Sequence, residues 1–324
     1  MATLAFEVVR RIPYNRPVSA TVFHPLDAST RYCAVYGHPV AHSASPAMHN
    51  AGLDALGLTG WRYIAFDVHP DELAAAINGA RAMKFSGLNL TVPHKLLALP
   101  LMDVLDESAK KWGAVNTVRF ETQDADGNWV ALGQVPASAV NRIRSVGYNT
   151  DADAIVRSIR EDLGLELRGK SVFLLGAGGA GRVAAMKVAE QGVRELHLLN
   201  RTRSKAEAVA DEIAVLYPGV STKIGYPDQP VDLVLNATSM GLKAEDPLPF
   251  EETLFSLRSA RHAYDMIYRP AETRFLKLAK ESGCKTANGI GMLLYQGASA
   301  QELWTGKPAA ISVMRSALVK HVYG

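Results

Sequence analysis

The sequence predicts an α/β fold made of two α/β domains, and three observations carry that prediction. Residues 31 to about 120 alternate between apolar runs of strand length and helix-like segments, which is typical of a mainly parallel sheet covered by helices. Residues 171–205 repeat the order strand, helix, strand around a glycine-rich turn. The length of 324 residues suits two domains rather than one.

In the first half we expect strands at 32–36, 61–68 and 85–92, with helices at 46–56 and 71–83. Residues 1–30 contain three prolines that break long elements, so they form either an edge strand or a partly ordered arm, and no chemistry is assigned to them. The polar stretch 121–146 is expected to be irregular. An amphipathic helix is expected at 153–163, and a domain boundary near Asp151.

In the second half we expect strands at 172–175, 195–199, 231–235 and 263–267, with helices at 182–190 and 204–217. The second helix starts with a capping box, Ser204 to Glu207. The tail 292–323 is expected to be helical and to return to the first domain. The predicted domains are therefore 1–150 together with 291–324, and 151–290.

Composition and charge limit the classes of function. A hydrophobic content of 48% and a charged content of 21% are those of a soluble globular protein. The net charge is only +3 and no basic run is present, so nucleic acid is not an expected partner. No apolar run has transmembrane length, and the start of the chain lacks the apolar core of a signal peptide. The two cysteines, Cys33 and Cys284, fit a reducing compartment, and we expect a cytoplasmic protein that does not bind membranes.

The glycine-rich turn, GAGGAG at 176–181, predicts a dinucleotide-binding site. In a G-x-G-x-x-G motif the first glycine permits the tight turn, the second lets the backbone approach a pyrophosphate, and the third lets the helix pack closely. The alternative is a glycine turn without a ligand, but the strand before it and the helix after it favour the nucleotide. Asn200, Arg201 and Thr202 end the next strand where NAD-specific folds carry Asp or Glu. This loop favours NADP.

A polar stretch at 37–50 places Ser43 and Ser45 just before Pro46. Ser45 is expected to be the N-cap of a helix whose first residue is Pro46. The same pair of hydroxyls at the positive end of a helix also suits a small carboxylate. The three histidines of this stretch do not predict a metal site, because prolines interrupt the helix that would align them and no carboxylate is interleaved.

A second polar stretch at 87–95 places Asn89 and Thr91 on one face of a strand, near its carboxyl end. Ligands of open α/β sheets bind beyond these ends, so the pair should meet water or a ligand. Lys95 follows, and by itself is readily explained as a solvated lysine; Asp151 is likewise readily explained as an N-cap. If Lys95 and Asp151 converge across a cleft, they could exchange a proton with an alcohol or ketone oxygen during hydride transfer.

Together these stretches resemble the shikimate dehydrogenase family, which reduces 3-dehydroshikimate with NADPH. The order and spacing of the shared motifs, rather than any one of them, make the resemblance specific. The motifs are GHPVAHSASPAMHN (37–50), GLNLTVPHK (87–95), GAVNTV (113–118), GYNTD (147–151), GAGGAGR (176–182), NRT (200–202), NATSMGL (236–242), YDMIYRP (264–270), NGIGMLLYQGA (288–298) and LWTG (303–306). The resemblance implies a substrate domain, a Rossmann-like NADP domain and a substrate cleft between them.

The resemblance also implies roles for the matching positions. Lys95 and Asp151 look like the catalytic pair, with Lys95 as the proton-transfer group. Ser43 and Ser45, with Tyr268 nearby, would hold the substrate carboxylate. The ring hydroxyls would be bound by Asn89, Thr91, Asn116 and Gln296. The cofactor would be lined by Gly176, Ala177, Gly178, Gly179, Ala180, Gly181, Asn200, Arg201, Thr202, Lys205, Thr238, Met266 and Gly289.

The implied small-molecule partner is shikimate or 3-dehydroshikimate, and the protein is expected to be a monomer or a homodimer. Three features depart from the family pattern: residues 1–30, the insertion 134–146, and Ala152 where glycine is usual. One alternative is a relative that uses quinate or an aminated analogue with NAD; Ser45 weighs against it, since quinate-active relatives often carry threonine there. The other is a non-catalytic paralogue that senses a ligand; the presence of Lys95 and Asp151 weighs against it.

Overall fold

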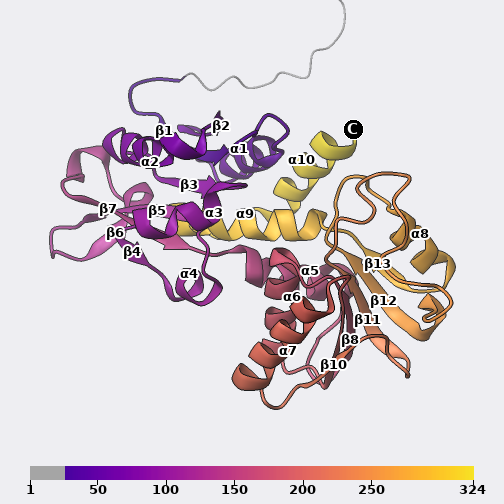
Figure 1. Ribbon diagram of the computed structural model, residues 1–324. Coiled ribbons are helices and arrows are strands. Elements are labelled where there is room, and N and C mark those ends of the chain that lie inside the picture. The colour runs from indigo at the N-terminus through magenta and orange to yellow at the C-terminus, as the bar shows by residue number, and fades with distance from the viewer. Residues whose placement is uncertain (1–25) are drawn as a thin grey trace, which may run out of the picture.

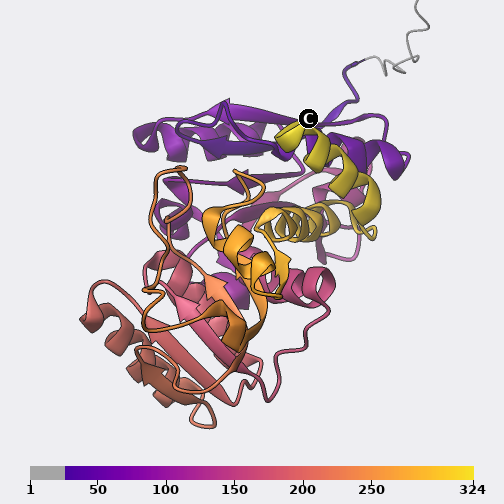
Figure 2. The same ribbon diagram turned by 90° about the vertical axis from the view of Figure 1, so that its right-hand side faces the viewer.

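Two β-sheets, each with helices packed against it, form the two lobes of the molecule (Figure 1). The structure is a computed structural model that describes residues 26–324. The expectation of an edge strand or an arm at 1–30 falls almost entirely outside the described residues. Turning the molecule by 90° shows the same separation of the lobes, with the C-terminal helices against the first lobe (Figure 2).

The first sheet has the strand order β2-β1-β3-β5-β7-β4, with β6 paired to β5. Strand β1 runs parallel to β2 and β3, and β4 parallel to β7, whereas β5 is antiparallel to its neighbours. Its strands are β1 Arg31–Gly37, β2 Trp61–Asp67, β3 Gly87–Leu90, β4 Val104–Leu105, β5 Thr117–Gln123, β6 Trp129–Ala131 and β7 Ile143–Tyr148.

The prediction that residues 121–146 are irregular is wrong. They include the end of β5, all of β6 and most of β7. Their polar side chains can lie in a sheet because partners on the same and the neighbouring strand satisfy them: the buried carboxylate of Glu121 pairs with Arg119 of β5 and, at 2.7 Å, with Arg144 of β7. A buried charge is tolerated when it is paired and hydrogen-bonded.

The helices that cover the first sheet are α1 Ser45–Ala55, α2 Leu73–Ala82, α3 His94–Leu97 and α4 Glu107–Trp112, with short 3₁₀ turns at Pro70–Glu72, Leu99–Leu101, Leu132–Gln134 and Ala137–Ala139. The tail forms α9 Ile290–Thr305 and α10 Ile311–Tyr323. Helix α10 packs on α1, and α9 packs on α5 and reaches β5. There the indole of Trp304 donates to the carbonyl of Val118 at 2.9 Å, so the predicted return of the tail to the first half is confirmed.

The second sheet is parallel throughout, in the order β10-β9-β8-β11-β12-β13. Its strands are β8 Ser171–Leu175, β9 Glu195–Leu199, β10 Ser221–Ile224, β11 Val231–Asn236, β12 Ala260–Asp265 and β13 Lys285–Ala287. Its helices are α5 Asp151–Leu163, α6 Gly179–Glu190, α7 Arg203–Leu216 and α8 Arg274–Glu281, with a 3₁₀ turn at Leu257–Ser259. The order reverses between β8 and β11, and ligands of such sheets bind at that point beyond the carboxyl ends of the strands.

The capping box predicted at Ser204 is not formed. Helix α7 begins one residue earlier, at Arg203, and Thr202 occupies its N-cap position. Glu207 pairs instead with Arg203 at 2.8 Å. The ion pair spans one helical turn. The Glu207 carboxylate, which a capping box would need, is therefore already bonded to Arg203.

Both cysteines, Cys33 and Cys284, are buried free thiols. Among residues 26–324, none of the helices combines the length and the apolar character needed to cross a membrane. Within the same described range, no group of three or more His, Cys, Asp or Glu side chains is arranged to hold a metal ion.

Candidate active site

One cavity brings together every residue predicted to bind the substrate or transfer the proton. Its volume is about 120 Å³. It is lined by Ser43, Ser45, Asn89, Thr91, Lys95, Asn116, Asp151, Tyr268 and Gln296, together with Val35, Val40, His42, Ala44 and Leu90. These residues come from both halves of the chain and from the C-terminal helix α9.

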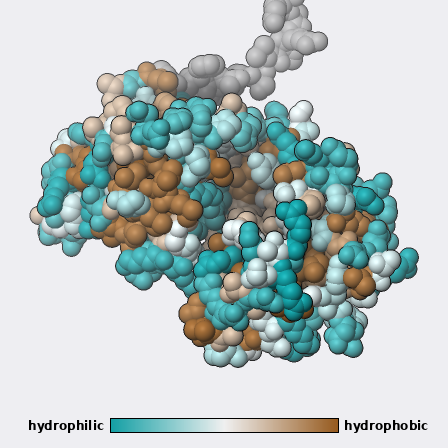
Figure 3. Space-filling model, viewed as in Figure 1, coloured by the Kyte–Doolittle hydropathy of each residue, from teal (hydrophilic) through white to brown (hydrophobic). Residues whose placement is uncertain are grey.

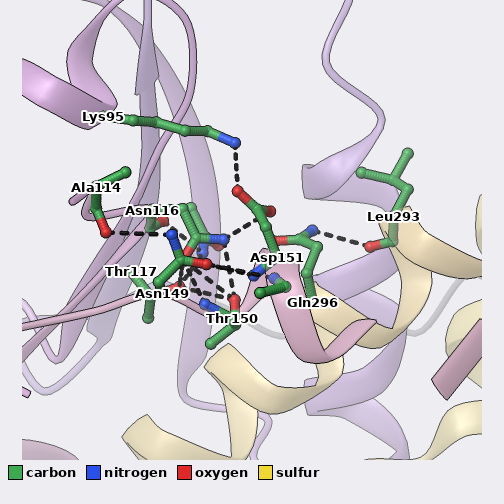
Figure 4. A network of polar contacts seen from close by, with 11 residues as sticks. Lys95, Ala114, Asn116, Thr117, Asn149, Thr150, Asp151, Leu293 and Gln296 are labelled. Carbon is green, nitrogen blue, oxygen red and sulfur yellow. Dashed lines mark hydrogen bonds and ion pairs between the residues drawn. The ribbon is translucent and has the colours of Figure 1, made fainter. Parts of the chain in front are cut away.

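Lys95 and Asp151 meet in this cavity (Figure 4). The Lys95 ammonium lies 2.6 Å from Oδ2 of Asp151, and the Asn116 amide donates to Oδ1 at 2.8 Å. The lysine side chain is 34% exposed and the aspartate side chain 17%, so the pair is largely screened from water yet open to the cavity. An ammonium held by a carboxylate in this way can donate a proton to a bound oxygen.

The N-cap interpretation of Asp151 is wrong. Asp151 is the first residue of α5, and the Asn149 side chain accepts from the backbone N–H groups of Asp151 and Ala152 at 3.1 and 3.3 Å. The helix end is thereby satisfied by a neighbour, and both oxygens of Asp151 remain available to Lys95 and Asn116.

Ser45 is not the N-cap of α1 either. Helix α1 begins at Ser45 itself, with Ala44 at the N-cap position and Pro46 in the first turn. The Ser43 hydroxyl accepts from the Ser45 N–H at 3.4 Å. Ser43 thus takes the local acceptor role, and the Ser45 side chain, 8% exposed, lines the cavity.

Asn89 is held by the protein, contrary to the expectation that it would need water or a ligand. The Tyr63 hydroxyl donates to Oδ1 of Asn89 at 2.7 Å, and Asn89 donates to the Thr117 hydroxyl at 3.1 Å. The Asn116 carbonyl also accepts from Asn89 at 3.3 Å. The Asn89 amide therefore has a fixed orientation at the cavity wall before any ligand binds.

The histidines at 38, 42 and 49 lie in three different surroundings. His38 bonds to Asp67 at 2.6 Å. His42 lines the cavity, a role that no sequence argument assigned to it beyond its place in the motif at 37–50. His49 is fully buried and stacked on Tyr63 with ring centroids 4.1 Å apart, and burial lowers its pKa to about 3.

The glycine-rich turn has the geometry that the motif predicts. Gly176 has a φ of +102°, which favours glycine, and a Cβ on Gly181 would lie 2.2 Å from the Gly176 carbonyl oxygen. Helix α6 starts at Gly179, earlier than expected. A Cβ on Gly178 or Gly179 would meet no heavy atom of the described residues within 4 Å. The start of α6 therefore faces open space, as an anion-binding helix end must.

The other predicted cofactor residues follow the carboxyl edge of the second sheet. Asn200 supports the glycine turn, since its side chain accepts from Ala177 N–H at 2.9 Å and donates to the Thr202 carbonyl at 2.8 Å. A Cβ on Gly176 would come within 2.9 Å of Thr238, and a Cβ on Gly289 within 2.1 Å of the Met266 carbonyl oxygen. These residues, together with Ala180 and Lys205 in the first turns of α6 and α7, lie along one rim.

A larger cavity, of about 500 Å³, adjoins this rim at the end of β9. It is lined by Leu199, Asn200, Arg201, Tyr226, Pro247, Leu248, Pro249, Phe250, Glu251, Glu252 and Arg274. Arg201 is exposed. Its guanidinium therefore has space on one side for a flat ring or a phosphate.

Asp265, which was not predicted from the sequence, connects three segments near this rim through hydrogen bonds. It is fully buried and accepts from the Thr273 hydroxyl at 2.6 Å, the Asn236 amide at 3.0 Å and the Ile267 N–H at 3.0 Å. Burial is the main cause that raises its pKa to about 6. The motif at 264–270 contains this residue, and its position at the end of a buried strand was the available indication.

The molecule is hollowed between the two lobes on the face shown in Figure 3, and apolar residues gather on the first lobe beside the hollow. Val92, Leu96 and Leu97, on or next to α3, are exposed by 70%, 66% and 46%. These side chains flank Lys95 in the sequence.

Comparison with known proteins identifies the family of this chain. Models of the shikimate dehydrogenase substrate-binding domain, of shikimate/quinate 5-dehydrogenase and of the shikimate 5′-dehydrogenase C-terminal domain match residues 35–118, 157–240 and 289–319. A shikimate dehydrogenase (NADP⁺) of Desulforamulus reducens is 40% identical over 92% of this chain and 97% of its own. The chain belongs to the shikimate dehydrogenase family.

Solved structures of family members agree with this assignment. Shikimate 5-dehydrogenase of Thermus thermophilus, in complex with NADP(H) and shikimate, is 36% identical with a TM-score of 0.72, covering 90% of this chain and all of that one. A quinate dehydrogenase of Corynebacterium glutamicum in complex with NAD is 31% identical with a TM-score of 0.73, covering 90% and 99%. The predicted two-domain α/β fold with a Rossmann-like domain is confirmed.

Proposed function

We propose that this chain is an NADP-dependent shikimate dehydrogenase that reversibly reduces 3-dehydroshikimate to shikimate in the biosynthesis of chorismate and the aromatic amino acids. The observation that carries the proposal is the Lys95–Asp151 pair at 2.6 Å, in a cavity whose walls present the hydroxyl and amide groups that a polyhydroxylated carboxylate requires. The family supports NADP as the cofactor, since curated relatives are named shikimate dehydrogenase (NADP⁺).

The substrate carboxylate would be bound by Ser43 and Ser45 at the start of α1, with Tyr268 beside them. Hydroxyls and a positive helix end both stabilise a carboxylate. The ring hydroxyls would face Asn89, Thr91, Asn116 and Gln296, all of which line the same cavity. Because the Asn89 and Asn116 amides are already hydrogen-bonded to the protein, little side-chain entropy is lost on binding.

NADPH, when bound, supplies the hydride that adds to the ketone carbon. The carbonyl π electrons move onto oxygen, and the Lys95 ammonium donates a proton to that oxygen, so that ketone, hydride and proton together give the alcohol. Asp151 holds Lys95 in place through the contact of 2.6 Å. In the reverse direction Lys95 accepts the proton from the shikimate hydroxyl.

The cofactor would lie along the rim formed by Gly176 to Gly181, Thr238, Met266 and Gly289. Its pyrophosphate would meet the open start of α6, and its 2′-phosphate would face Arg201, Thr202 and Lys205. The proposal includes domains at 1–150 with 291–324 and at 151–290, a cytoplasmic location, and a monomeric or homodimeric state. None of the residues that line the substrate cavity belongs to the insertion at 134–146.

A panel of shikimate and quinate, each with NADP and NAD, tests the proposal. We expect the highest kcat/KM with shikimate and NADP. A higher kcat/KM with quinate and NAD would contradict the proposal and favour the quinate dehydrogenase alternative. Binding of shikimate without turnover in any of the four combinations would favour a ligand-sensing paralogue.

A further inference from the structure

We propose that Asn149 is a positioning residue that sets the geometry of the Lys95–Asp151 pair. A single side-chain amide at Asn149 connects the two segments that carry the pair: its oxygen accepts from the start of α5, and its nitrogen donates to Ala114, whose neighbour Val115 bonds to the Lys95 backbone. The inference rests on the proposed function, since it assigns Asn149 an effect on the proton transfer.

The oxygen of Asn149 fixes the Asp151 side. The first N–H groups of a helix have no partner within the helix and need an acceptor from outside it. Asn149 Oδ1 accepts from the N–H of Asp151 at 3.1 Å and of Ala152 at 3.3 Å. The N-cap residue itself, Thr150, is occupied elsewhere, since its hydroxyl accepts from the Asn116 amide at 3.0 Å. Because Asn149 satisfies the helix end, the Asp151 carboxylate can turn to Lys95.

The nitrogen of Asn149 fixes the Lys95 side (Figure 4). Asn149 Nδ2 donates to the carbonyl of Ala114 at 3.2 Å. The next residue, Val115, donates its N–H to the carbonyl of Lys95 at 2.8 Å. Two hydrogen bonds thus connect the amide of Asn149 to the backbone of Lys95, while its oxygen bonds directly to the backbone at the start of α5.

Asn149 is itself held in place and kept out of the cavity. Its side chain is buried, with 6% of the residue exposed. Its N–H donates to the Ser108 hydroxyl at 3.0 Å, and that hydroxyl donates to Asp106 at 2.6 Å. Asn149 is not among the residues that line the substrate cavity. Its effect on the reaction therefore has to pass through the positions of Lys95 and Asp151, not through contact with the substrate.

The arrangement requires both halves of an amide. Serine at this position would keep an acceptor for the helix end, but its short side chain could not also donate to Ala114. Alanine would lose both contacts. The two substitutions therefore separate capping of α5 from bridging to the Lys95 segment.

The experiment compares Asn149→Ala and Asn149→Ser with the wild-type full-length enzyme, by steady-state kinetics with shikimate and NADP and by thermal unfolding. We expect Asn149→Ala to lower kcat by about 10–100-fold, because a misplacement of about 1 Å has effects of this size. The KM for shikimate should change by less than about threefold, since the residues that line the cavity are retained. Asn149→Ser should recover much of the lost Tm while its kcat stays low.

Ser256→Ala is the matched control. The Ser256 hydroxyl also accepts from a backbone N–H, that of Arg258 at 3.3 Å, at the start of the 3₁₀ turn Leu257–Ser259. This turn leads into the amino end of β12, whereas the candidate ligand site lies at the carboxyl ends of the strands. Its kcat should equal that of the wild type.

Three outcomes overturn the inference. A wild-type kcat in Asn149→Ala would do so, as would recovery of kcat together with Tm in Asn149→Ser, which would reduce the role to capping. A rise in KM with kcat unchanged would mean that Asn149 acts on substrate binding. An inactive wild type would instead contradict the proposed function, which keeps the two failures distinct.

Discussion

The ammonium of Lys95 lies 2.6 Å from the carboxylate of Asp151, although 56 positions separate the two residues in the sequence. Lys95 is carried by the short helix after β3, and Asp151 begins the helix after β7. Asn116 donates to the second oxygen of Asp151, so the carboxylate has a donor on each oxygen. The pair is therefore a fixed unit, and removing either member should affect the same step.

Replacing Lys95 by alanine should lower kcat by about 10²–10⁴-fold, the range for loss of a positioned proton-transfer group. The KM for shikimate should change much less, because the carboxylate and hydroxyl contacts remain. Asp151→Asn, which keeps the shape but loses the charge, should also be slow. Steady-state kinetics checks both, and a kcat for Lys95→Ala within about threefold of wild type would show that another group transfers the proton.

Ser43→Ala and Ser45→Ala should each raise the KM for shikimate about tenfold or more, since a hydrogen bond to a charged group contributes about 1.5–3 kcal/mol. Because Ser45 is not the N-cap of α1, its loss should leave Tm nearly unchanged. Ser316→Ala, at an exposed serine of α10, is the control for both measurements. An unchanged KM in both variants would locate the carboxylate elsewhere.

Arg201→Ala should lower kcat/KM with NADP about tenfold or more, while kcat/KM with NAD changes little, because a charge-assisted contact to the 2′-phosphate is worth about 1.5–3 kcal/mol. Arg203→Ala, two residues further on at the start of α7, is a matched control, since that guanidinium is already paired with Glu207 at 2.8 Å. Its cofactor preference should equal that of the wild type. Equal efficiencies of NADP and NAD in the wild type itself would contradict the cofactor assignment.

Gly178→Ala separates a dinucleotide site from a glycine turn without a ligand. Gly178 has an extended backbone, φ −76° and ψ −170°, and an added Cβ would meet no heavy atom of the described residues within 4 Å. Tm should therefore change little, whereas the Kd for NADP should rise about tenfold or more if the pyrophosphate comes this close. Gly219→Ala, where an added Cβ also has open space among the described residues, should leave both unchanged. Unaltered NADP binding by Gly178→Ala would favour the empty turn.

Asp265→Asn should change the pH dependence of stability. Burial raises the pKa of Asp265 from 3.8 to about 6, so the folded protein binds this proton more tightly than the unfolded chain. The resulting stabilisation is complete below pH 3.8 and is lost as the pH rises through about 6. The variant lacks this loss, so its free energy of unfolding relative to wild type should rise by up to about 3 kcal/mol between pH 4 and 7. Urea unfolding across this range checks the sign; a constant difference would mean that Asp265 does not titrate there.

The order of strands and helices in residues 31–92 and 171–217 could be predicted from the sequence because it depends on local periodicity. Runs such as 172–175 and 231–235 are apolar along most of their length, as strands buried on both faces must be, and both are strands in the structure. The glycine turn could be predicted for the same reason, since a φ of +102° at Gly176 is a requirement on one residue. Ser43, Ser45, Asn89, Thr91, Lys95 and Asp151 could be named in advance because they stand near the ends of these elements, whereas Tyr268 and Gln296, which lies within α9, were named through the family resemblance.

Other features depended on partners far along the chain, and only the tertiary structure decided them. The segment 121–146 is rich in polar residues, and Glu121 can be buried there because Arg119 and, from β7, Arg144 pair with it. The starts of the helices at Ser45, Asp151 and Arg203 differ from the predicted caps because other side chains hold the groups concerned. Ser43 and Asn149 accept from the N–H groups of Ser45 and Asp151, and Arg203 pairs with the carboxylate of Glu207. The sequence by itself determined which groups are available, since that is a matter of residue type and local pattern. The packing of segments that are distant in the sequence decided which of these groups lie within hydrogen-bond distance of each other, as Lys95 and Asp151 do.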